Sequence, residues 1–164
     1  MSAAADGTQG VGWSESAVFS PDGSKVLFVS DVSNLVAGDT NGATDIFVKD
    51  LATGAVTLVS TAADGTQGNG WNQSAVFSSD GSKILFSSGS SNLAAGDTNG
   101  GDVFVKDLAT GAVTLVSAAA DGTQGNGWSE SAVFSSDGNK VLFASDANNL
   151  VVGDTNGTMG IFVK

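Results

Sequence analysis

The sequence predicts an all-β protein made of three similar units, each a small antiparallel sheet. The segment 16–30 holds two short apolar runs joined by Pro-Asp-Gly, and close copies of it return at 74–88 and 131–145. Short runs of Val, Ile, Leu and Phe between Gly, Asp, Asn and Ser are typical of strands and turns, and no helical period extends over a long window. The chain is therefore an internal repeat, with units at 1–60, 61–117 and 118–164.

Each unit is expected to contain four antiparallel strands, except the last, which is expected to lack its outer strand. In the first unit the strands fall at 16–20, 25–30, 45–51 and 55–60. The first three are nearly continuous apolar runs, which favour burial on both faces, whereas the fourth alternates and suits an outer edge. The long connections at 30–44 and 61–73 are expected at the same end of the sheets, because antiparallel strands place alternate turns at opposite ends.

The apolar residues indicate how the sheets stack. The nine phenylalanines fall on the first three strands of the units and are predicted to form the core: Phe19, Phe28, Phe47, Phe77, Phe86, Phe104, Phe134, Phe143 and Phe162. A sheet with two apolar faces must be covered on both sides, and radial stacking of four-stranded sheets gives a β-propeller. Three blades are fewer than the four to eight of typical rings, so the ring is expected to close by oligomerisation. A homodimer giving six blades is preferred, with a homotrimer giving nine as the runner-up.

Charge and composition exclude several classes of function. Seventeen acidic residues against six lysines give a net charge of −11, which disfavours nucleic acid and membrane surfaces as partners. His, Cys, Tyr and Arg are absent, so no Ser-His or Cys-His pair exists for nucleophilic catalysis. A glycosidase pair of Glu15 and Glu130 is disfavoured, because Gln73 stands at the same place in the second copy. We therefore expect no enzyme, and the N-terminal residues lack the apolar stretch of a signal peptide.

The string FSPDGSKVLFVS, followed by DIFVKDLATG, resembles the blade of TolB-type β-propellers, the Pro-Asp-Gly relatives of WD repeats. The resemblance covers nearly the whole chain and is closest to bacterial arrays with DGTQGNG and GDTNG loops, which implies a secreted or cell-surface parent protein. Ser79 and Ser136 replace Pro21, and Gly160 replaces Asp45. The close similarity of the copies and the truncated last unit are typical of an engineered or recently amplified three-blade fragment.

The aspartate-rich loop of each unit is a candidate calcium site. The residues concerned are Asp39, Asn41 and Asp45, then Asp97, Asn99 and Asp102, and in the third copy only Asp154 and Asn156. Oxygen ligands at the first, third and seventh positions, with a Gly that permits a sharp turn, resemble part of an oxygen-rich calcium loop. The alternative, which the residues favour, is an Asx turn in which these side chains bond their own backbone.

The other long loop carries a tryptophan just before the first strand of each unit. Trp13 is followed by Glu15, Trp71 by Gln73 and Trp128 by Glu130. An aromatic face beside amides and carboxylates can hold a sugar ring, so carbohydrate is a candidate ligand. The alternative, again favoured, is that each indole covers the neighbouring blade.

The sequence therefore predicts a non-catalytic, self-assembling β-propeller scaffold or interaction module. A calcium-dependent, lectin-like glycan-binding propeller is the alternative function, and an enzyme is a distant third.

Overall fold

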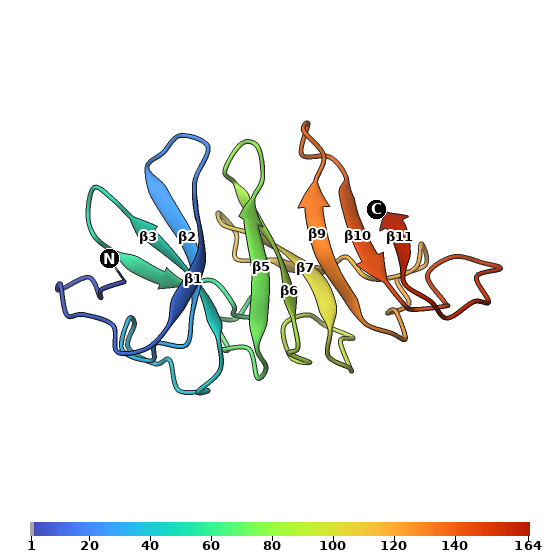
Figure 1. The fold of residues 1–164 in the computed structure, drawn as a ribbon, viewed down its shortest axis with the longest axis horizontal. Helices are drawn as coiled ribbons and strands as arrows, with labels where there is room; N and C mark the ends of the chain where they lie inside the picture. Colours follow the sequence, from blue (N-terminus) through green and yellow to red (C-terminus); the bar gives the residue numbers. More distant parts are fainter. Residues whose placement is uncertain (1) are drawn as a thin grey trace.

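A computed structural model describes residues 2–164. Within this range the chain forms eleven strands and no helix, arranged in three antiparallel sheets that we call the first, second and third blades (Figure 1). The first blade consists of β1 (Ser14–Phe19), β2 (Lys25–Ser30), β3 (Asp45–Asp50) and β4 (Val56–Leu58). The second consists of β5 (Asn72–Phe77), β6 (Lys83–Ser88), β7 (Asp102–Asp107) and β8 (Val113–Leu115). The third consists of β9 (Ser129–Phe134), β10 (Val141–Ser145) and β11 (Gly160–Val163).

Strands that follow one another in the sequence are neighbours in each blade. The strand orders are β1-β2-β3-β4, β5-β6-β7-β8 and β9-β10-β11, so the predicted four-stranded blades and three-stranded last blade are confirmed. The three blades lie side by side along the long axis, with the two chain termini at opposite ends of the array (Figure 1). None of the described residues forms a helix that is long and apolar enough to cross a membrane.

The innermost strand of each blade contains a bulge that the apolar pattern did not reveal. In β1 the pairing with β2 shifts register between Glu15 and Val18. Ser16 lies within this shift with a φ of 54°, and Ser74 and Ser131 repeat it at 55° and 54°. An extra residue in the left-handed region re-aims a strand and increases its twist. The strand consequently starts at Ser14, two residues earlier than predicted.

The core lies between the blades. At the first junction Leu27, Ile46 and Val48 of the first blade pack on Ala75, Ile84, Phe86 and Phe104 of the second. At the second junction Leu85 and Val103 pack in the same way on Ala132, Val141 and Phe143. The second blade is therefore covered on both faces, as its continuous apolar strands require.

The two outer blades are each covered on one face only. Phe19 on β1 is 69% exposed, so the prediction that all nine phenylalanines are in the core is wrong at this position. The physical reason is that residues 2–164 form no blade before the first, whereas the equivalent Phe77 is half-buried against the first blade. At the other end, alternate residues of β11 are exposed, because residues 2–164 form no blade after the third.

Candidate functional site: the glutamine clasps between blades

The two long loops of successive blades meet through one glutamine at the first junction. The side-chain amide of Gln67 donates to Asp39 Oδ1 at 2.8 Å and to Asp45 Oδ2 at 3.0 Å. Its carbonyl oxygen accepts the Thr40 N–H at 3.1 Å. This contact confirms that the two long loops lie at the same end of the sheets. We call the arrangement the glutamine clasp, because one side chain joins the loop before one blade to two carboxylates of the preceding blade.

The second junction repeats the clasp. Gln124 Nε2 donates to Asp97 Oδ1 at 2.9 Å and to Asp102 Oδ2 at 2.7 Å, and its carbonyl oxygen accepts the Thr98 N–H at 3.0 Å. It also contacts Asn99 Oδ1. Since both junctions use the same partners, the clasp is a property of the repeat.

A serine completes the set of partners of the deeper carboxylate. The Ser60 hydroxyl donates to Asp45 Oδ1 at 2.5 Å and accepts the Ile46 N–H at 3.2 Å. Asn72 Nδ2 also donates to Asp45 Oδ1, at 3.2 Å. A fully buried carboxylate needs such donors, because an unpaired buried charge is very costly.

Burial sets the electrostatics of the clasps. It raises the pKa of Asp45 and of Asp102 above the ordinary value, against the opposing effect of the serine hydroxyls that hydrogen-bond them. Burial, with the charge of Asp102 adding to it, raises the pKa of Asp97 to about 6. The aspartates of the clasps therefore take up a proton more readily than exposed aspartates do.

A lysine holds each loop on the blade that follows it. Lys49 Nζ on β3 donates to the Ala3 carbonyl at 2.7 Å, and Lys106 Nζ on β7 donates to the Thr61 carbonyl at 2.6 Å. Lys164 Nζ does the same to the Ala118 carbonyl at 2.8 Å. The loop before a blade is therefore anchored on that blade by lysine, and at the two internal junctions it is also joined to the preceding blade by glutamine.

The residues predicted to bind calcium form the acceptor side of the clasps. Asp39 and Asp45 come together, but the Gln67 amide bridges them, and Asn41 Oδ1 accepts the Ala43 N–H at 2.8 Å in an Asx turn. In the part of the chain that the structure describes, no group of three or more His, Cys, Asp or Glu residues is placed to hold a metal ion. Calcium binding stays a prediction, and the hydrogen bonds favour the turn interpretation.

The third aspartate loop lies apart from the others. Asp154 Oδ1 accepts the Asn156 N–H at 3.3 Å, and Asn156 Oδ1 accepts the Thr158 N–H at 3.0 Å. Asn156 is exposed, and Gly160 stands where the first two blades have a buried aspartate. The loop keeps the turn of the other copies and lacks a glutamine from a following blade.

Two of the three predicted sugar-binding tryptophans cover one another. Trp71 and Trp128 are stacked, with ring centroids 5.1 Å apart and an angle of 22° between the planes. Trp128 Nε1 also donates to Glu130 Oε2 at 3.1 Å. Each of these indoles has therefore given one face to the other, which favours the interpretation that they cover neighbouring blades.

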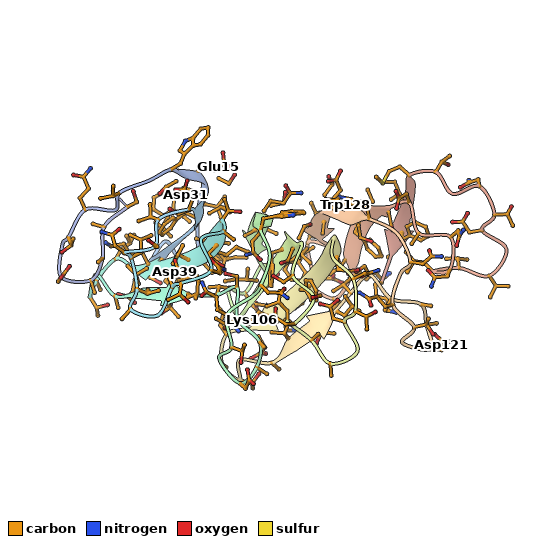
Figure 2. All side chains as sticks on the ribbon, turned by 90° about the horizontal axis from the view of Figure 1, so that it is seen from below. Glu15, Asp31, Asp39, Lys106, Asp121 and Trp128 are labelled. Carbon is orange, nitrogen blue, oxygen red and sulfur yellow. The ribbon has the colours of Figure 1, made fainter. Side chains whose placement is uncertain are left out.

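Of the remaining candidates for sugar binding, Trp13 and Glu15 line one small hollow with Asp31, whereas Gln73 lies on the second blade. Trp13 is 74% exposed, and its backbone N–H donates to Asp31 Oδ1 at 2.5 Å. Glu15 is exposed and Gln73 is half-buried, one on the first blade and one on the second. Figure 2 shows Glu15 and Trp128 toward one long side of the array and Asp121 toward the other.

The clasp glutamines were missed from the sequence. Gln67 lies 22 residues from Asp45 in a polar loop, and glutamine has no charge or metal-ligand chemistry to single it out. The available signal was the repeat itself, because Gln9, Gln67 and Gln124 stand at the same place in an Asp-Gly-Thr-Gln-Gly string that all three copies share.

Comparison with known proteins defines the fold. No family model and no curated protein matches the sequence. Among solved structures, a protein assigned as TolB from Agrobacterium tumefaciens aligns with a TM-score of 0.53 and 19% identity, over 91% of this chain and 50% of the other. The tricorn protease aligns with a TM-score of 0.54 and 15% identity, over 91% of this chain and 12% of the protease. An oligogalacturonate lyase in complex with manganese aligns with a TM-score of 0.50 and 21% identity, over 77% of this chain and 27% of the lyase.

These likenesses support a TolB-like β-propeller fold. The chain spans half or less of the length of each of these three proteins. The likeness therefore concerns the propeller fold alone, and some of the similar proteins are enzymes.

Proposed function

We propose that the chain is a non-catalytic β-propeller module that assembles with copies of itself into a ring-shaped scaffold. The observation that supports this most directly is the open apolar face of the third blade. Leu142 on β10 is 40% exposed and Ile161 on β11 is 67% exposed, whereas the equivalent Leu85 and Val103 of the second blade are fully buried. Equivalent side chains thus lie in an interface on the second blade and at the surface on the third.

The first blade offers the matching face. Ala17 and Phe19 on β1 are exposed, whereas Ala75 on β5 is buried and Phe77 is half-buried against the preceding blade. A hollow of about 340 Å³ lies on this face, lined by Ser14, Ala17, Val26, Phe28 and Leu51 among others. Because the blades are repeats, these two open faces correspond to the two faces that pack together at each internal junction.

Burying these faces supplies the driving force. A large apolar side chain taken fully out of water contributes roughly 1.5–3 kcal/mol, and exposed apolar patches of this kind mark interaction sites. Two copies give six blades, which lies within the usual range for propellers, and three copies give nine. We prefer the dimer for that reason.

The residues present also favour a non-catalytic role. The carboxylates with raised pKa values, Asp45, Asp97 and Asp102, all accept hydrogen bonds from the glutamine of a clasp. The chain lacks His, Cys and Tyr, so no imidazole, thiol or phenol accompanies these carboxylates. The structural explanation of their burial, a joint between blades, accounts for their pKa shifts.

The calcium-dependent glycan-binding alternative rests on Trp13, whose indole is the most exposed of the three. Titrating oligosaccharides while following tryptophan fluorescence tests it, with Trp13→Phe as the comparison. A saturable, calcium-dependent change that the substitution removes would support a lectin over a scaffold.

Sedimentation velocity of two matched variants tests the scaffold proposal. Ile161→Asp puts a charge into the open face of the third blade and should leave the chain monomeric at concentrations where the wild type associates. Val152→Asp adds the same charge at a fully exposed loop residue, whose equivalents Ala37 and Ala95 are exposed even beside a following blade, and should associate like the wild type. Equal behaviour of the two variants would contradict the proposal.

A further inference from the structure

We infer that copies join head to tail through a third glutamine clasp, in which Gln9 of one copy binds the Asp154 loop of the next. This inference rests on the proposed self-assembly and adds the polar contact that fixes its direction and register. At both internal junctions the loop before a blade donates a glutamine to the aspartate loop of the preceding blade. Among residues 2–164, Gln9 is the donor and Asp154 the acceptor that this rule leaves without its counterpart.

The donor loop already has its binding shape although no blade precedes it. The Gly10 N–H donates to the Ser2 carbonyl at 2.9 Å, Asn34 Nδ2 donates to the Gln9 carbonyl at 3.1 Å, and Lys49 holds Ala3. The equivalent bonds before the second blade join Gly68 to Ser60, Asn92 to Gln67 and Lys106 to Thr61. Binding by Gln9 therefore requires little ordering of the backbone, which favours association.

The side chain of Gln9 is free to bind. It is exposed, and among residues 2–164 its amide takes part in no hydrogen bond, in contrast to Gln67 and Gln124. The Gln9 amide, whose equivalents form the two internal clasps, is therefore exposed in the loop before the first blade.

The acceptor loop offers the complementary groups. Asp154 corresponds to Asp39, which accepts the Gln67 amide at 2.8 Å. Asn156 corresponds to Asn41, whose Nδ2 donates to the Gly68 carbonyl at 2.9 Å, so it can donate to the Gly10 carbonyl of the copy that supplies Gln9. The charge is also favourable, because a neutral amide of one copy meets a carboxylate of the other and no second charge is introduced.

The clasp sets the direction of assembly. Among residues 2–164, the unused donor lies before the first blade and the unused acceptor on the third, so each contact joins different surfaces of the two copies. Such heterologous contacts exclude pairing of two identical faces, and they give a ring with cyclic symmetry where the rotation from copy to copy closes, as the curvature of a propeller provides. Two or three copies joined in this way would place every blade in the same orientation around the ring.

The joint between copies has fewer bonds than an internal junction. Gly160 removes the buried carboxylate that receives serine and glutamine in the first two blades. In the joint, the hydroxyl of Ser2, the equivalent of Ser60, would accept the Ile161 N–H of the other copy, as Ser60 accepts the Ile46 N–H, and would have no carboxylate to donate to. The copies should therefore separate at this joint before the internal junctions open.

An isosteric exchange at the joint tests the inference on the full chain. Gln9→Glu places a carboxylate against Asp154 and should weaken association at least about 10-fold, because a hydrogen bond to a charged group is lost and a like-charge contact appears. Adding Asp154→Asn restores an amide opposite the carboxylate with donor and acceptor exchanged. The double variant should return to within about 3-fold of the wild-type dissociation constant.

A charge control keeps the result specific. Gln73→Glu adds the same negative charge on β5, at a position where the other two copies carry Glu15 and Glu130, and should change the dissociation constant by less than about 2-fold. Unfolding midpoints of all variants show that they fold. An associating wild type whose Gln9→Glu variant behaves like Gln73→Glu would overturn the clasp and leave self-assembly standing, whereas a monomeric wild type would overturn both.

Discussion

The indole of Trp71 stacks on that of Trp128 across the second junction, with ring centroids 5.1 Å apart. Gly101 permits this contact, because a Cβ on Gly101 would lie 2.5 Å from Trp128 Cε3. The first aspartate loop is one residue longer than the second and carries Thr44, whose hydroxyl donates to the Asn72 carbonyl at 3.2 Å. One deleted residue thus distinguishes the two junctions.

The Trp71 and Trp128 side chains should therefore be energetically coupled. A double-mutant cycle with Trp71→Ala and Trp128→Ala should give a coupling energy of about 0.5–1.5 kcal/mol in the free energy of unfolding, as stacked aromatic pairs do. The matched cycle with Trp13→Ala and Trp71→Ala should give a value near zero, because these two are not stacked. Denaturant titration checks both, and equal coupling in the two cycles would refute the stack.

The buried aspartates should make stability fall as pH rises through the mildly acidic range. The pKa of Asp97 rises from 3.8 to about 6 on folding, so the folded state binds its proton more tightly. The contribution of Asp97 to the free energy of unfolding is therefore largest below about pH 4 and is lost as pH rises toward 6. Asp97→Asn should flatten this slope.

Asp80 provides the control for that pH profile. The Ser78 hydroxyl lowers the pKa of Asp80 to about 2, so its contribution is present above pH 3.8 and is lost as pH falls toward 2. Asp80→Asn should change the free energy of unfolding only in its dependence on pH below about 4. Chemical denaturation between pH 2 and pH 8 separates the two effects, and an Asp97→Asn profile that keeps the wild-type slope between pH 4 and 6 would contradict the assignment.

The bulge on the innermost strands should tolerate glycine and reject β-branched residues. Ser74 is exposed and has a φ of 55°. Ser74→Val should lower the free energy of unfolding by about 1–2 kcal/mol, because the left-handed region is costly for a side chain branched at Cβ. The free energy of unfolding of Ser74→Gly should exceed that of Ser74→Val by about 1–2 kcal/mol, because glycine adopts the left-handed region without strain.

A matched substitution on extended backbone separates this effect from β propensity. Thr57→Val changes an exposed residue of β4 and should alter the free energy of unfolding by less than about 0.5 kcal/mol. If Ser74→Val were as well tolerated as Thr57→Val, the left-handed conformation would not constrain this position.

Calcium should have little effect on the clasps. A metal ion at Asp39 and Asp45 would have to displace the Gln67 amide that bridges them. We expect the melting temperature of the wild type to be the same in calcium, in magnesium and with a chelator. A rise specific to calcium would instead support the metal site predicted from the sequence.

The sequence predicted the blades because each strand is a local apolar run bounded by turn residues. The edge position of β4 and the three-stranded last blade follow from the same pattern. The bulge at Ser16, Ser74 and Ser131 was not predicted, because the pattern of apolar residues carries no information on a single residue with a left-handed φ. Phe19 was misplaced because its burial depends on a neighbouring blade that precedes it in the other two copies.

The candidate site was only half predictable. The aspartate loops were recognised from the spacing of their oxygen ligands, and the Asx turn at Asn41 was anticipated as the alternative. Their true partner, Gln67, approaches from the next repeat and bonds through a neutral amide. Contacts between repeats depend on how blades stack, which no local window of sequence describes.

Native mass spectrometry of the intact chain tests the central claim, that the open faces of the first and third blades associate. Each chain has a mass of 16.2 kDa. The account predicts a species of two chain masses, or of three if nine blades close the ring. A chain that remains at a single mass at every concentration at which it is soluble would contradict self-assembly.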